Sequence, residues 1–158
     1  MKYFPFVCFF TLFFIFSAIS QNNADTDKVE FELVNSVKIW DASHHNGFPA
    51  LINFRGDLYC AFREGSRHVG DEGAIRLIRS PDAENWTTVE KFAFDKMDMR
   101  EGRFSITPSG NLMLHLSLSK YDENGNLEYY QTMVTQTTNG EKWMNPKVIE
   151  NTDHWLWE

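Results

Sequence analysis

The 158-residue sequence is poor in cysteine and in positive charge. Its cysteines are Cys8 and Cys60, and its 15 Lys and Arg are outnumbered by 22 Asp and Glu, for a formal net charge of −7. An acidic chain is poorly suited to nucleic acid, whose phosphates require a basic face. We therefore expect no nucleic-acid partner.

Long apolar runs are absent except at the N-terminus. Residues 3–16 are almost uniformly apolar behind Lys2, and the small residues Ala18 and Ser20 occupy the −3 and −1 positions of a cleavage site. This is the layout of a secretory signal peptide, and the run is short for a spanning helix of about 20 residues. We predict a signal peptide over residues 1–20, a periplasmic or extracellular location, and no stable membrane anchor after cleavage.

Cleavage would leave Cys60 as the single cysteine of an otherwise exported chain. An intrachain disulfide is then excluded, despite the oxidising destination. The core must come from apolar packing, for which the aromatic content of 15% provides bulk.

The sequence also lacks the apolar period of an amphipathic helix. Residues 21–28 are polar and predict a flexible leader, whereas from Val29 short apolar runs alternate with turn residues. Between residues 111 and 119, Leu alternates strictly with other residues, which is the period of a strand. The chain is therefore predicted to be all-β, with strands over 48–54, 57–65, 73–80, 87–94, 102–108, 111–119, 127–137 and 147–150.

These strands fall into two copies of one unit. "RGDLYCAF" (55–62) matches "SGNLMLHL" (109–116) at an offset of 54, and "SPDAENW" (80–86) matches "TTNGEKW" (137–143) at an offset of 57. A four-stranded unit repeated at about 50 residues is typical of a β-propeller blade. The alternative is two unrelated meanders.

We accordingly divide residues 29–158 into blade 1 at about 48–94, blade 2 at about 100–150 and the start of a third. Each matched octet, 79–86 and 136–143, lies between the third and fourth strands of its unit. A short carboxylate or amide can accept hydrogen bonds from its own turn while a Trp packs beneath, so we expect a structural role. The residues expected to do this are Ser80, Asp82, Trp86, Thr137, Asn139 and Trp143.

The two octets resemble the Asp-box, or bacterial neuraminidase repeat, of usual form Ser-x-Asp-x-Gly-x-x-Trp. Both are one residue shorter before Trp and have Glu in place of the Gly, and the second has Asn in place of Asp. With "FPALI", "GDLYCAFREG" and "HVGDEGAIRLIRSPD" around the first octet, residues 48–149 resemble the start of the sialidase superfamily. That resemblance implies a six-bladed propeller, of which this chain would be an N-terminal fragment; a ring of several copies is the alternative.

The resemblance also implies exo-α-sialidase-type glycoside hydrolysis. Such enzymes use a Tyr nucleophile with a Glu partner, an Arg cluster that grips the substrate carboxylate, and an Asp acid/base. Only the first Arg and the Asp would fall within this chain, and Gly47 stands where that Arg is expected. We predict that the chain is inactive alone.

Candidate site residues cluster at the ends of the predicted strands. Asp71 lies near the family's acid/base position in the loop 63–73, and His68 is a rival acid/base; Glu64 is the second candidate catalytic residue. For each residue the alternative is a solvated loop or an ordinary ion pair, and Arg63 could simply pair with Glu64. The candidate substrate-binding residues are Arg63, His45, Asn46, His68, Arg100, Glu101 and Arg103.

The histidines show no metal-ligand spacing, so we expect no metal and no cofactor. The first hypothesis is an exported sialidase-like hydrolase acting on the terminal sugars of a glycan. The second is a non-catalytic propeller that binds glycan or protein, which Gly47 favours. A purely structural repeat module is the third.

Overall fold

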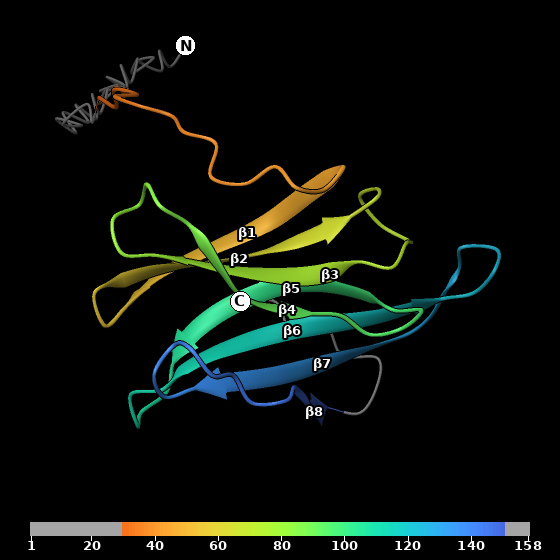
Figure 1. Cartoon of the computed structure of the whole chain (residues 1–158). Helices are drawn as coiled ribbons and strands as arrows, with labels where there is room; N and C mark the ends of the chain where they lie inside the picture. Colours follow the sequence, from red (N-terminus) through yellow and green to blue (C-terminus); the bar gives the residue numbers. More distant parts are fainter. Residues whose placement is uncertain (1–29, 151–158) are drawn as a thin grey trace, which may run out of the picture. The chain divides into compact units, whose positions relative to one another are not determined.

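Two four-stranded antiparallel sheets account for the regular structure of residues 30–150, the part of the chain that the computed structural model describes (Figure 1). The predicted signal peptide, the leader and residues 151–158 lie outside this part. The strands are β1 (His45–Phe54), β2 (Asp57–Gly65), β3 (Ala74–Ser80), β4 (Thr87–Phe92), β5 (Asp98–Ile106), β6 (Leu112–Tyr121), β7 (Leu127–Thr137) and β8 (Lys147–Glu150).

Each sheet is a simple meander, in the orders β1-β2-β3-β4 and β5-β6-β7-β8. The prediction of an all-β chain with two four-stranded units is therefore confirmed. Residues 30–36 belong to a separate unit, without regular secondary structure. Within residues 30–150 we find no helix of the length and apolarity needed to cross a lipid bilayer.

The first strand of each sheet begins three or four residues earlier than the sequence pattern predicts. Both strands contain a break in register, between Gly47 and Ala50 in β1 and between Arg100 and Arg103 in β5. At each break one residue has positive φ, Phe48 (55°) and Glu101 (53°), and these two are 53 residues apart. A bulge interrupts the two-residue alternation, so the residues before it look like loop in the sequence.

The turns also repeat. Arg55 and Gly56, both with positive φ, form the two-residue turn of the first hairpin, and Gly110 has positive φ in the corresponding loop. In the first octet turn the Asp82 carboxylate accepts hydrogen bonds from the backbone N–H groups of Glu84 (3.0 Å) and Asn85 (2.8 Å). These bonds fix the turn that carries the chain from β3 to β4.

The second octet turn has the same hydrogen bonding with an amide in place of the carboxylate. Asn139 Oδ1 accepts from the backbone N–H groups of Glu141 (3.1 Å) and Lys142 (3.2 Å). Its Trp143 packs edge to face on Phe92 of the first sheet, at 6.3 Å between ring centroids. This octet turn therefore contributes to packing between the sheets.

The main core lies between the two sheets, where β5 packs against β1, β2 and β3 (Figure 1). The first sheet contributes Tyr59, Ala61, Ile75, Leu77 and other residues of the same face, and the second contributes its alternating leucines. A smaller cluster of Cys60, Phe62 and Ile78 lies on the other face of the first sheet, beneath Ile39, Trp40 and Trp86. The first sheet is thus covered on both faces.

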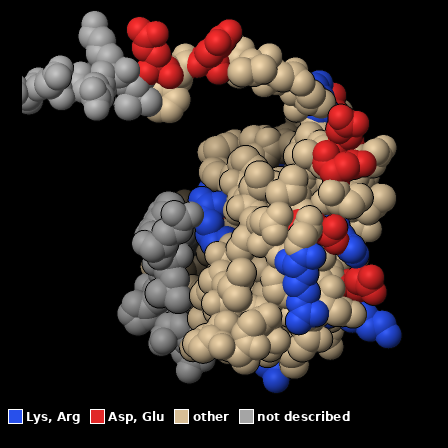
Figure 2. All heavy atoms as spheres, turned by 90° about the vertical axis from the view of Figure 1, so that its left-hand side faces the viewer, with Lys and Arg blue, Asp and Glu red and all other residues tan. Residues whose placement is uncertain are grey.

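The surface carries charges of both signs. On the face shown in Figure 2, Lys and Arg side chains lie beside Asp and Glu side chains. Ion pairs of the described residues include Arg79 with Asp57 and Lys120 with Glu128, the latter at 2.6 Å. The negative charge of the acidic residues is therefore partly neutralised by neighbouring Lys and Arg side chains.

Candidate functional site

The loop between β2 and β3 is built around the side chain of Arg63. This side chain is only 1% exposed, and all three of its nitrogens bind protein oxygens. Nε donates to Asp98 Oδ1 at 2.7 Å, Nη1 donates to the carbonyl of Arg67 at 2.7 Å, and Nη2 pairs with Asp71. Because Asp98 is the first residue of β5, the Arg63–Asp98 ion pair joins the two sheets.

The backbone passes so close to the Arg63–Asp98 ion pair that positions 65 and 73 require glycine. A Cβ atom on Gly73 would overlap Asp98 Oδ1 and Arg63 Nε, and one on Gly65 would overlap Arg63 Nη1. The two glycines at the ends of the loop therefore leave room for the guanidinium and its partners. Burial alone would lower the pKa of Arg63, but hydrogen bonds and charges from Asp98 and Asp71 outweigh it and raise that pKa.

Asp71, the candidate acid/base, is held at the mouth of the same loop. Its Oδ2 accepts hydrogen bonds from the Ser66 hydroxyl (2.7 Å) and from the backbone N–H of Arg67 (3.2 Å), and its Oδ1 pairs with Arg63. Burial would raise the pKa of Asp71, but the bonds from Ser66 and the Arg63 guanidinium lower it to about 2. The loop thus fixes an oriented, ionised carboxylate; its catalytic role stays a prediction.

Glu64 points to the opposite face of β2 from Arg63. Its carboxylate accepts hydrogen bonds from Arg76 (2.9 Å) and from Trp40 Nε1 (2.7 Å), and Lys91 lies at 3.6 Å. Burial would raise the pKa of Glu64, but these partners lower it overall. The alternative in which Arg63 and Glu64 pair with each other is wrong, because successive side chains of a strand point to opposite faces.

Asp71 lies between two concave surfaces. One, of about 560 Å³, also contains Glu64, so both candidate catalytic carboxylates border it together with Arg76 and Lys91. The other, of about 340 Å³, is bordered by Gly70, Asp71, Glu72, Lys96, Asp98, Tyr121 and Asp122. The charged residues predicted from the loop sequence therefore surround hollowed parts of the surface.

A column of planar side chains lies beside the two bulges. His45 Nε2 and His68 Nδ1 are 3.0 Å apart, and the two rings stack with centroids 5.2 Å apart. The ring of Phe48 lies 5.0 Å from His68, and the Arg100 guanidinium lies 5.3 Å from the centre of Phe48. Arg100 also donates to the Tyr121 hydroxyl at 3.5 Å. The column therefore connects β1, the β2–β3 loop and β5.

The remaining candidates make local contacts. Asn46 donates to the carbonyl of Ser43 at 2.9 Å, and Arg103 donates to Glu101 at 3.3 Å. The contacts given above form two groups, Arg63 with Asp71 and Asp98, and His45 with His68, Phe48 and Arg100. Glu64 lies on the opposite face of β2 from Arg63.

Asp98 is the site residue that the sequence analysis missed. It heads β5, is buried, and holds Arg63. Its position 53 residues after His45 places it at the same point of the repeat. Extending the repeat upstream through the bulge aligns Asp98 with His45, but it does not identify Asp98 as the partner of Arg63.

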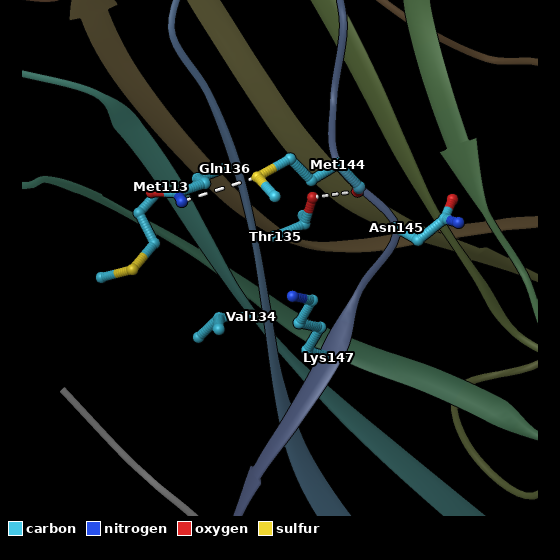
Figure 3. A pocket seen from close by; sticks show the side chains of 7 residues that line it. All are labelled: Met113, Val134, Thr135, Gln136, Met144, Asn145 and Lys147. Atoms are coloured by element: carbon cyan, nitrogen blue, oxygen red, sulfur yellow. Dashed lines mark hydrogen bonds between the residues drawn. The ribbon is translucent and has the colours of Figure 1, made fainter.

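A separate, mostly apolar pocket of about 150 Å³ lies on the second sheet, and none of the predicted catalytic or substrate-binding residues lines it (Figure 3). Within it, Thr135 Oγ1 donates to the Met144 carbonyl at 2.5 Å. Its lining residues are Met113, Val134, Thr135, Gln136, Met144, Asn145 and Lys147. In the part of the chain that the structure describes, no three His, Cys, Asp or Glu side chains are grouped so that they could hold a metal ion.

Comparisons with known proteins include a likeness to a solved structure. No protein-family model matches the chain, and no curated protein matches it. A solved structure, described as that of an unknown-function protein from Dyadobacter fermentans DSM 18053, is similar with a TM-score of 0.51 and 18% sequence identity. The match covers 65% of this chain and 36% of that chain, so it spans little more than a third of the neighbour. At this identity the likeness concerns the fold alone.

Proposed function

We propose that this chain supplies two blades of a sialidase-type β-propeller that is exported and acts as a glycoside hydrolase on the terminal sugars of glycans. Its two sheets would be neighbouring blades, with β1 and β5 as their inner strands. The matching bulges, turns and octet turns of the two sheets support this assignment. The propeller itself is inferred from the repeat and from the resemblance of the octets to Asp-boxes.

The observation that carries the proposal is the placement of Asp71. The loop fixes this carboxylate beside the end of β2, through Arg63, whose partner Asp98 begins β5, and at the border of two concave surfaces. In many proteins the catalytic and binding groups are charged side chains at strand ends that face a shared concave surface. We assign Asp71 the acid/base role, with Arg100 and His68 as neighbouring sugar-binding groups.

A specific observation favours a second function, a non-catalytic propeller that binds glycans. A general acid must carry a proton near its working pH, and a pKa of about 2 leaves Asp71 ionised. Hydrolysis then requires a bound ligand, or groups beyond residues 30–150, to raise that pKa. Without them, the same surface would bind a sugar and leave it intact.

The test is the hydrolysis of fluorogenic glycosides by the protein expressed from its complete reading frame. The hydrolase predicts turnover that Asp71→Asn lowers by roughly 100-fold or more, as expected for loss of an acid/base. Asp41→Asn, at an exposed ion pair, is the control and should leave turnover unchanged. Circular dichroism establishes that both variants are folded.

Binding to a glycan array separates the two functions. Glycan binding without turnover identifies the non-catalytic propeller. If the protein neither binds glycans nor turns over glycosides, both functions are contradicted and a structural repeat module remains.

A further inference from the structure

One of the differences between the two bulges bears on which sugar the proposed site would accept. Arg100 precedes the β5 bulge, and 53 residues earlier Gly47 precedes the β1 bulge. The second sheet therefore places a guanidinium where the first sheet has no side chain.

The space next to Gly47 is filled by the imidazole of His45. A Cβ atom on Gly47 would lie 3.1 Å from His45 Cε1, closer than carbon atoms normally approach. His45 is held there by His68, through the 3.0 Å contact between ring nitrogens and the stacked arrangement of the rings. An arginine at position 47 would have to displace this pair.

The arginines nearby are already engaged with groups of the protein. The nitrogens of Arg63 bind Asp98, Asp71 and a backbone carbonyl. Arg103 donates to Glu101, and Arg100 contacts Phe48 and Tyr121. A forked guanidinium–carboxylate contact, the usual way to grip an acidic sugar, needs an arginine whose donors face the ligand.

The charges around the loop and the bulges give no excess of positive charge for an anionic ligand. The cationic side chains are those of Arg63, Arg67, Lys96, Arg100 and Arg103, and the carboxylates are those of Asp71, Glu72, Asp98, Glu101 and Asp122. The local balance is therefore close to neutral, and it provides no electrostatic attraction for a sugar carboxylate.

We propose that the site accepts an uncharged terminal sugar, and that the His45–His68 pair sets this preference by filling, beside Gly47, the place that Arg100 holds in the second sheet. This inference rests on the proposed glycan-binding function. The imidazoles, Tyr121 and the carboxylates are suited to hydrogen-bond sugar hydroxyls, and the ring of Phe48 is suited to pack against a sugar face.

The test compares two matched glycans, lactose and 3′-sialyllactose, immobilised on one surface with the purified chain in solution. We expect the galactose-terminated glycan to bind at least about 10-fold more tightly. Tighter binding of the sialylated glycan would overturn this inference and leave the proposed function standing. Binding of neither glycan, nor of other terminal sugars on an array, would overturn the proposed function and this inference with it.

A double variant that removes the imidazole and gives position 47 the arginine of the second sheet tests the cause. His45→Gly with Gly47→Arg removes the imidazole and introduces the guanidinium, and we expect it to raise affinity for the sialylated glycan about 10-fold or more. His45→Gly alone is the matched control and should give no such gain. An equal gain in the control would show that the imidazole only blocks access, and would overturn the role assigned to position 47.

Discussion

The two sheets share one backbone plan but differ in the side chains that fill it. In the first sheet Glu64 and Arg76 form a largely buried ion pair at 2.9 Å, whereas the repeat positions in the second sheet hold the buried residues Leu118 and Met133. The same strands and turns therefore accommodate either pair. The bulges and turns determine the backbone structure of each sheet. The Glu64–Arg76 ion pair of the first sheet is not required for that structure.

The connections between the second and third strands differ in a corresponding way. In the second sheet, β6 and β7 extend to a five-residue turn at 122–126, and Asp122 accepts its hydrogen bonds from within that turn. In the first sheet β2 and β3 stop earlier, and residues 66–73 form the loop around Arg63. The loop of the candidate site is therefore present because the β2–β3 hairpin ends earlier than the β6–β7 hairpin.

The largest predicted effect comes from breaking the ion pair that joins the sheets. Asp98→Ala leaves the Arg63 guanidinium buried without its main partner, so we expect the free energy of unfolding to fall by about 3–5 kcal/mol. Urea unfolding at pH 7 measures it, and Asp98→Asn provides a milder variant if the alanine variant does not fold. Asp41→Ala, at an exposed pair, should cost less than about 1 kcal/mol. Equal costs for the two pairs would contradict the prediction.

The second prediction converts the first sheet toward the second. Glu64→Leu alone removes the partner of Arg76 and the acceptor of Trp40, and we expect a loss of about 2–3 kcal/mol. Adding Arg76→Met recreates the apolar pair of the second sheet and should recover most of this loss. Chemical denaturation of the single and double variants measures the recovery. A double variant less stable than Glu64→Leu would show that the two sheets are not interchangeable at this position.

A third prediction concerns pH and the loop of the first sheet. The folded-state pKa of Asp71 is about 2 and its ordinary value is 3.8, so its contribution of about 2 kcal/mol is complete above pH 4 and is lost as pH falls toward 2. The stability difference between the wild type and Asp71→Asn should therefore shrink from pH 7 to pH 2. Asp122→Asn, in the exposed turn of the second sheet, should show a weaker dependence because solvent screens that carboxylate. A constant difference for Asp71→Asn would contradict this account.

The last prediction compares the two octet turns, where Ala83→Gly should have the smallest effect. Gly140 has φ of 81° with the Tyr59 hydroxyl against it, whereas Ala83 holds the equivalent position at φ of 64°. In Gly140→Ala the strained φ alone should lower the free energy of unfolding by about 1–2 kcal/mol, and the overlap of the new Cβ with the buried Tyr59 side chain adds to this loss. Ala83→Gly should change it by at most about 1 kcal/mol, because relief of the strained φ offsets the added flexibility of glycine. Thermal unfolding of both variants measures these changes. A larger loss of stability for Ala83→Gly than for Gly140→Ala would contradict the equivalence of the two turns.

Regular alternation and turn residues made most of the fold predictable from the sequence. The bounds of β2, β7 and β8 match the predicted runs, because each run keeps its pattern up to a turn. The starts of β1 and β5 were missed, since a bulge in each strand breaks the alternation.

The candidate site was less predictable than the fold. The charge-rich loop stood out in the sequence, but the partner of Arg63 did not, because Asp98 lies 35 residues further on and meets it only when the sheets pack. The contact between His45 and His68 likewise depends on how the loop folds back over β1. Local patterns thus identified the loop, and packing between the sheets determines which of its groups pair.

The thiol of Cys60 can report on local opening of the first sheet. Its thiol is buried beneath Trp40 and Trp86, and burial raises its pKa to about 11. A thiol reagent attacks the thiolate, so the folded protein should react only during excursions that lift the covering residues away. The labelling rate therefore measures how often the first sheet opens, and the repeat position in the second sheet, Leu114, offers a second place to install the same reporter.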